Sequence, residues 1–117
     1  MPTTTVTVIV PCFNEVDHIE ACLCDLFGQD YPAALLDVIV ADGMSTDGTR
    51  AVLAELAARW PQRLQLIDNP QRVQAAALAA MVPLATGDVI VRADVHARYA
   101  PDYVRQCVAE GAVTGAD

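Results

Sequence analysis

The chain has 117 residues, 54% of them hydrophobic, and its 15 acidic side chains outnumber the 7 basic ones to give a formal net charge of −8. A chain of this length is expected to form one domain over residues 1–117, and it contains no apolar run near the ~20 residues that span a bilayer. The acidic charge argues against nucleic acid or an anionic membrane surface as the main partner.

Strands and helices are predicted to alternate along the chain. Short β-branched or apolar runs predict strands at 6–10, 36–41, 64–67 and 89–91. Apolar residues at helical spacing predict helices at 14–29, 47–60, 71–84 and 101–110. Asn14 is expected to cap the first helix, and Pro83 is expected to kink or end the third. This order is typical of parallel βαβ units, and so of an α/β fold with helices on both faces of a mostly parallel sheet.

The four cysteines predict reduced thiols rather than a disulfide framework. They form no C-x-x-C pair, and no histidine stands at zinc-finger spacing from them. The first five residues lack the positive segment of a secretory signal, so a cytoplasmic location is expected. The last segment, 111–117, resembles the approach to a further strand, and the chain is therefore interpreted as the front half of a larger protein.

Acidic or metal-competent side chains follow three of the four predicted strands. Asn14 and Glu15 follow the first, Asp42 follows the second, and Asp94 and His96 follow the fourth. In an open parallel sheet, ligands bind beyond the carboxyl ends of the strands, at the point where the strand order reverses. These side chains are therefore the first candidates for a binding site.

The segment 42–49, DGMSTDGT, has two interpretations that stay open. Its Gly, Asp and Thr residues suit a tight turn followed by a helix cap. Alternatively, Asp42 accepts a hydrogen bond from a base or ribose held over the sheet edge. Neither G-x-G-x-x-G nor G-x-x-x-x-G-K-[ST] is present, so the chain lacks a dinucleotide fingerprint and a P-loop.

Asp94 and His96 are the sharper candidates for a metal site. Alternate residues at a strand end project the same way, so both side chains are expected to face one ligand. A carboxylate and an imidazole make a partial shell for Mn²⁺ or Mg²⁺, completed by water and phosphate oxygens. The alternative is that His96 only caps or packs in its loop. Arg72, Arg92 and Arg98 suit a phosphate near this edge, or else solvated surface positions and ion pairs.

Four segments in order resemble family 2 glycosyltransferases of the Rossmann-like GT-A fold. They are VIVPCFNE at 8–15, VIVADGMSTDGT at 38–49, ATGD at 85–88 and DVH at 94–96. The segment 92–103 is most similar to bacterial exopolysaccharide enzymes of the succinoglycan type, in which D-x-H replaces the usual D-x-D. The resemblance covers nearly the whole chain.

The resemblance implies a nucleotide-binding site and a divalent metal, Mn²⁺ or Mg²⁺. The implied nucleotide-binding residues are Pro11, Phe13, Glu15, Asp42, Arg72 and Asp94. Asp94 and His96 are the implied metal ligands, with His96 where a carboxylate usually stands. The implied reaction transfers a sugar from a nucleotide-diphosphate donor, expected to be UDP-linked, to a saccharide or lipid-linked acceptor. No residue of this chain is assigned as the catalytic base, because the family's acceptor half supplies it.

Several positions depart from the family pattern. Ala41 stands where many relatives carry Asp, Met44 is inserted before Ser45, and Ala79 and Met81 replace the usual residues of the third helix. His96 suits softer ions than Mg²⁺. An unpaired sheet edge favours self-association, and a longer parent protein would place this part at the inner face of the membrane.

The alternative function is a non-catalytic α/β module that binds a nucleotide or a metal. A phosphate receiver that uses Asp42 and Asp94 around Mg²⁺ belongs to this class. It predicts a lysine near the acidic pocket, and the chain contains no lysine. That absence favours the transferase.

Overall fold

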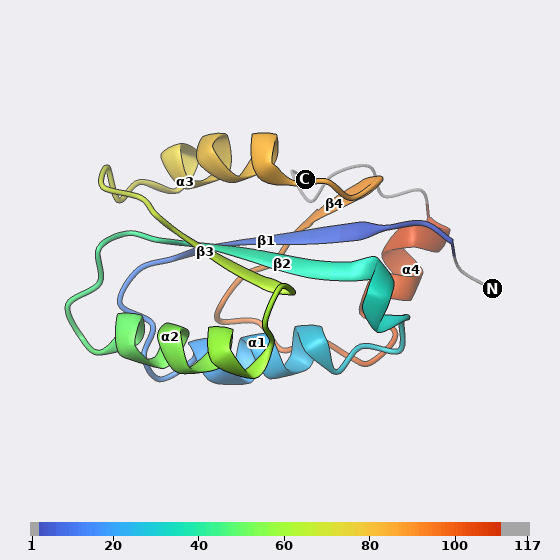
Figure 1. Ribbon diagram of the computed structural model, residues 1–117, viewed down its shortest axis with the longest axis horizontal. Helices are drawn as coiled ribbons and strands as arrows, with labels where there is room; N and C mark the ends of the chain where they lie inside the picture. Colours follow the sequence, from blue (N-terminus) through green and yellow to red (C-terminus); the bar gives the residue numbers. More distant parts are fainter. Residues whose placement is uncertain (1–2, 111–117) are drawn as a thin grey trace.

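A four-stranded parallel sheet forms the centre of the computed structural model, which describes residues 3–110 (Figure 1). The strands are β1 (Val6–Cys12), β2 (Leu36–Asp42), β3 (Leu64–Asp68) and β4 (Val89–Arg92), in the order β3-β2-β1-β4. Each strand pairs in parallel with its neighbours. The expected approach to a further strand at 111–117 lies outside the described residues.

Helices cover both faces of the sheet, which confirms the expected α/β class (Figure 1). The helices are α1 (Ile19–Phe27), α2 (Thr49–Arg59), α3 (Gln74–Met81) and α4 (Tyr103–Ala109). Val8 and Val10 of β1 pack into a core with α1, α2 and α4, whereas Ile9 packs into a smaller core with α3. The central strands β1 and β2 are therefore buried on both faces, which is why their sequences are nearly continuous apolar runs, whereas the edge strand β3 is largely exposed.

Two helix boundaries decide where loop residues lie. Helix α1 begins at Ile19, so the expectation that Asn14 caps it is wrong. Asn14 instead adopts a left-handed backbone with φ of 52°, which Asn tolerates better than most residues. The expectation for Pro83 is confirmed, because α3 ends at Met81 and a 3-10 turn, η2 (Val82–Leu84), follows. A second 3-10 turn, η1 (Ala33–Leu35), precedes β2.

The strand order places the switch point between β1 and β4. The chain moves outward from β1 to β2 and β3, and then returns to place β4 on the other side of β1. Ligands of open α/β sheets bind at such a reversal, beyond the carboxyl ends of the strands. Among residues 3–110, no helix is long and apolar enough to cross a membrane.

Asp25 of α1 holds the connection from β4 to α4 in place. Arg98 donates two hydrogen bonds to its carboxylate, at 2.6 and 3.0 Å, and the Tyr99 amide donates a third at 3.0 Å. The hydrogen bonds from Arg98 lower the pKa of Asp25 below its ordinary value, against the opposing effect of burial. The loop that carries the predicted metal ligands is thereby fastened to α1.

We expect Arg98→Ala to destabilise the fold at neutral pH and to have less effect in acid. A carboxyl whose pKa is lowered on folding contributes stability above its unfolded pKa of about 4, and this contribution is lost as the pH falls through the folded pKa. Thermal unfolding from pH 7 to pH 3 measures the difference between the two proteins. Arg105→Ala, which removes an exposed pair with Asp30, is the control. An Arg98→Ala deficit that persists unchanged to pH 3 would contradict the assignment.

We expect Gly87→Ala to destabilise the fold by about 1–3 kcal/mol, because overpacking forces the backbone to shift. A Cβ at Gly87 would lie 2.5 Å from the Thr7 amide nitrogen and 2.8 Å from the Val6 carbonyl carbon, inside β1. Urea unfolding measures the loss, and Thr86→Ala at the exposed neighbouring position is the control. Equal stability of the two variants would contradict this packing.

Candidate functional site

Hydrogen bonds fasten the loop after β1 to the loop after β2. We call residues 13–18 the β1 loop and residues 43–48 the β2 loop. Asn14 joins them twice. Its backbone amide donates a hydrogen bond to Ser45 Oγ, and its side-chain Oδ1 accepts one from the Thr46 backbone amide, both at 2.8 Å. The Glu15 amide donates to Thr49 Oγ1 at 2.9 Å. These bonds fix the backbone that carries Glu15.

The segment 42–49 turns the chain into α2, as its residue types predict. Gly48 takes φ of 102°, which favours glycine, and it is the N-cap residue of α2. The expected side-chain cap by Asp or Thr is not formed. Asp47 Oδ1 instead accepts a hydrogen bond from the Thr49 amide at 3.0 Å, and the role of Asp42 toward a nucleotide stays a prediction.

Three residues with left-handed backbones lie in the loops at the carboxyl edge of the sheet. Asn14, Met44 and Arg72 have φ of 52°, 64° and 66°. Such a conformation costs a non-glycine residue about 1–2 kcal/mol and persists only where the surroundings hold it. Met44 is the residue inserted before Ser45 relative to the family pattern. Gln62, just before β3, also has a positive φ of 67°, so such backbones are not confined to this edge and do not by themselves mark a site.

A cavity of about 160 Å³ brings together four of the six predicted nucleotide-binding residues. Its lining includes Pro11, Phe13, Glu15 and Arg72. The Arg72 guanidinium lies 5.5 Å from the centre of the Phe13 ring, and Phe13 is 39% exposed. An exposed ring and a guanidinium make a platform on which a planar base can stack.

The cavity also contains residues that the sequence analysis missed. Asn69, Gln74 and Cys12 also line it, although the Cys12 side chain packs into the larger core with α1 and α2. Burial, with added repulsion from Asp42 and Glu15, raises the pKa of the Cys12 thiol to about 12. Cys12 is therefore a protonated thiol at neutral pH and has no nucleophilic role.

Asp42 lies apart from this cavity and is engaged by other protein groups. Ser45 Oγ donates to Asp42 Oδ1 at 2.6 Å, and the Ser45 amide donates to Oδ2 at 3.0 Å. Arg50 forms an ion pair with Asp42 at 2.9 Å and a second with Asp68, also at 2.9 Å. These three charged residues line a separate cavity of about 200 Å³. A base could reach Asp42 only by sharing its oxygens with Ser45 and Arg50.

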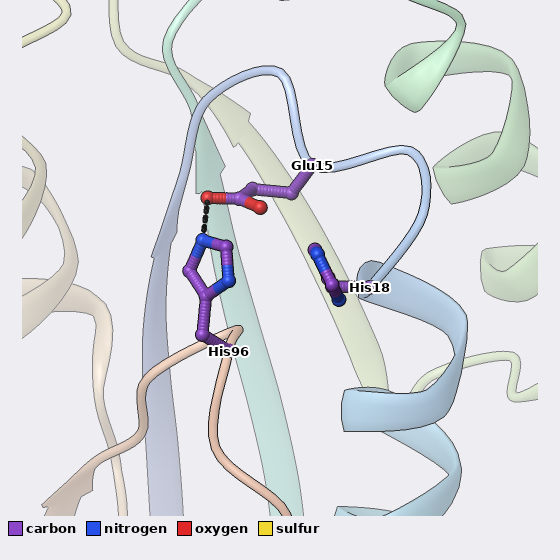
Figure 2. A group of neighbouring side chains, drawn as sticks. All are labelled: Glu15, His18 and His96. Carbon is purple, nitrogen blue, oxygen red and sulfur yellow. Dashed lines mark hydrogen bonds and ion pairs between the residues drawn. The ribbon is translucent and has the colours of Figure 1, made fainter.

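Asp94 and His96 lie in a turn, because β4 ends at Arg92. We call residues 93–102 the β4 loop. Asp94 Oδ1 accepts a hydrogen bond from the His96 amide at 2.9 Å. The His96 imidazole is directed at the β1 loop, where its Nε2 lies 2.8 Å from Glu15 Oε2 (Figure 2). The strand alternation expected of this pair does not apply to the turn.

His18 completes a group of possible metal ligands with Glu15 and His96. One ligand atom from each of the three lies within 4.8 Å of the others, and the two imidazole rings are 4.6 Å apart between centroids (Figure 2). His18 is the residue before α1. It was missed because Asn14 was expected to begin the helix, although both histidines of the chain follow strands at the carboxyl edge.

A larger cavity, of about 600 Å³, lies at the opposite edge of the sheet. It is lined by residues that precede strands, including Thr5, Leu36 and Gly87. Ligands of this fold class bind at the carboxyl edge, so this amino edge is not the candidate site.

Comparison with known proteins supports the same fold. The profile of Glycosyl transferase family 2 matches residues 7–117. The succinoglycan biosynthesis protein ExoA of Rhizobium meliloti (strain 1021) is 40% identical over 119 residues, which cover 100% of this chain and 36% of that protein. The chain thus spans about a third of the length of this relative.

Two solved structures extend the comparison. The mannosyltransferase PcManGT from Pyrobaculum calidifontis, in complex with GDP-Man and Mn²⁺, matches with a TM-score of 0.85 and 37% identity, over 92% of this chain and 32% of that chain. S. aureus TarS in complex with UDP-GlcNAc matches with a TM-score of 0.73 and 22% identity, over 90% of this chain and 30% of that chain, and shows the fold alone. The GT-A fold expected from the sequence is therefore confirmed, and the chain belongs to glycosyl transferase family 2.

Proposed function

We propose that this chain forms the donor-binding part of a glycosyltransferase that uses a nucleotide-diphosphate sugar. The observation that carries the proposal is the cavity at the carboxyl edge of the sheet, which gathers Phe13, Glu15 and Arg72 and shares Glu15 with the metal-competent group. Membership of the family and the GDP-Man complex of the 37% identical mannosyltransferase support it. Transfer would be to a saccharide or lipid-linked acceptor, the acceptor class that the family resemblance implies.

The size of the cavity indicates which part of the donor it would hold. Its volume of about 160 Å³ is below the roughly 300–1,000 Å³ of pockets that enclose a whole small molecule. We therefore place the base against Phe13 and Arg72, with Asp42 reached at its far side. The ribose and diphosphate would extend along the carboxyl edge toward Asp94.

A divalent ion fits the donor set at this edge. Asp94 and His96 were predicted to hold Mn²⁺ or Mg²⁺, and the mannosyltransferase relative is in complex with Mn²⁺. The carboxylate and imidazole groups present are suitable ligands for Mn²⁺. When bound, such an ion would neutralise charge on the diphosphate leaving group. The chain's own residues hold the base and orient the donor, and no described residue is assigned as the base that deprotonates the acceptor.

We further propose a cytoplasmic location and self-association. The described cysteines are free thiols, Cys24 is exposed, and such thiols persist in reducing compartments. Strand β4 lies at one edge of the described sheet, and an open strand edge can pair with a second copy. Sedimentation over a range of concentrations tests the association, and a monomer at every concentration would contradict it.

We expect calorimetric titration to show that UDP or GDP binds this chain in the presence of Mn²⁺. Phe13→Ala and Arg72→Ala should each weaken binding by about five- to 160-fold, because loss of base stacking costs about 1–3 kcal/mol. Arg105→Ala removes an exposed arginine of α4 and should leave the affinity unchanged. A folded chain that binds neither nucleotide, or variants that bind like the wild type, would contradict the proposed site.

We expect Asp94→Ala to weaken nucleotide binding without reducing the thermal stability much, since Asp94 is exposed. Asp42→Ala should weaken binding and also lower the melting temperature, because Ser45 and Arg50 lose a buried partner. Ser45→Ala separates the effect on binding from the effect on stability, because it removes a hydrogen bond to Asp42 but keeps the Asp42 carboxylate. If Asp94→Ala and Asp42→Ala both bind the nucleotide as tightly as the wild type does, neither aspartate contacts the donor.

A further inference from the structure

The two histidines of the chain meet one carboxylate at the carboxyl edge of the sheet. Glu15 and His18 come from the β1 loop, and His96 comes from the β4 loop, 81 residues after Glu15 (Figure 2). Their ligand atoms lie within 4.8 Å of one another. Two imidazoles with one carboxylate form a set that suits zinc and the neighbouring transition metals.

The backbone that carries these three side chains is fixed in the described structure. The Glu15 amide is bonded to Thr49 Oγ1, and the Glu15 carbonyl accepts hydrogen bonds from the amides of His18 and Ile19 at 3.0 and 2.9 Å. His96 is held through its amide by Asp94. Metal binding would therefore require rotation of side chains, and no rearrangement of the loops.

The distances between the three ligand atoms need only modest adjustment to hold an ion. Zinc–nitrogen bonds of about 2.0–2.1 Å place two tetrahedral ligands about 3.3 Å apart. The Glu15–His96 pair is already at 2.8 Å, and the set as a whole spans up to 4.8 Å. The ion would take the place of the hydrogen between Glu15 Oε2 and His96 Nε2, which passes to the other ring nitrogen or to solvent.

We propose that Glu15, His18 and His96 bind a zinc-class divalent ion, with Zn²⁺ preferred over Mg²⁺. Mg²⁺ favours oxygen ligands in a strict octahedron, whereas imidazole favours Zn²⁺. The proposal deepens the proposed function, on which it rests for its biological role, because Glu15 also lines the nucleotide cavity. Asp94 is then a positioning residue that holds the His96 turn and remains available to the ribose.

The opposing interpretation is that Glu15 and His96 form an ion pair that only holds the β1 loop against the β4 loop, and that His18 packs beside it. His96 is 60% exposed in its side chain and Glu15 is 18% exposed, so such a pair contributes only about 0–1 kcal/mol. This interpretation predicts no metal affinity. The two interpretations therefore separate in a metal titration without nucleotide.

The experiment is calorimetric titration of the EDTA-treated, dialysed chain with Zn²⁺ and, separately, with Mg²⁺. A Cys24→Ser background removes the exposed thiol as a competing ligand. We expect one Zn²⁺ site and no Mg²⁺ binding at the same concentrations. His18→Ala, His96→Ala and Glu15→Gln should each weaken Zn²⁺ binding at least about tenfold, since even the loss of an outer-shell partner costs 10- to 100-fold.

Two matched controls test the ligand assignment. Asp17→Asn neutralises an exposed carboxylate in the same loop, and Asp94→Asn keeps an oxygen that can accept from the His96 amide. Both should change Zn²⁺ affinity by less than about threefold, well below the loss expected for a ligand. Circular dichroism checks that each variant is folded.

Three results would overturn the proposal. They are Zn²⁺ affinity unaffected by His18→Ala, Mg²⁺ binding as tight as Zn²⁺ binding, and a loss in Asp94→Asn equal to that in His96→Ala. Nucleotide titration distinguishes this failure from failure of the proposed function. An intact Zn²⁺ site with no nucleotide binding contradicts the donor site alone, whereas Mn²⁺-dependent nucleotide binding unaffected by His18→Ala contradicts the three-ligand site alone.

Discussion

The hydrogen bonds between the β1 loop and the β2 loop are the constraint on which the candidate site depends. Parallel strands determine where each loop begins, but they leave open where its side chains lie. Asn14 adopts a left-handed backbone and joins Ser45 and Thr46, so its neighbours cannot continue into α1. Helix α1 then starts late enough for His18 to face the edge of the sheet. The position of Glu15 follows from the same bonds.

Strand order supplies the second half of the site. Because β4 pairs with β1, the β4 loop emerges beside the β1 loop, and His96 reaches Glu15. Asp25 then holds the far end of the β4 loop through Arg98 and Tyr99. The β2 loop thus holds the β1 loop, and Asp25 of α1 holds the β4 loop. The two loops that carry the candidate site are distant in sequence and are fixed by different parts of the fold. Such bracing is what a preorganised binding site requires.

The period of the apolar residues was enough to predict the four strands, the four helices and the α/β class. Proline chemistry predicted the end of α3. Four of the six predicted nucleotide-binding residues line one cavity, and their role toward a nucleotide stays a prediction. The role of Asn14 could not be predicted, because the same side chain suits a helix cap and a left-handed turn. Arg50 and His18 were missed since their partners are set by strand order and loop register, which local patterns do not determine.

The ion pairs of the arginines bear on whether the proposed site needs a cation. Arg50 is engaged by Asp42 and Asp68, and Arg98 is engaged by Asp25. Among the described arginines, Arg63, Arg72 and Arg92 form no ion pair, and Arg72 is the one that lines the candidate cavity. One guanidinium cannot offset a diphosphate in a chain of net charge −8. Under the proposed function, a divalent ion beside Glu15 and His96 would supply the added positive charge that an anionic donor needs.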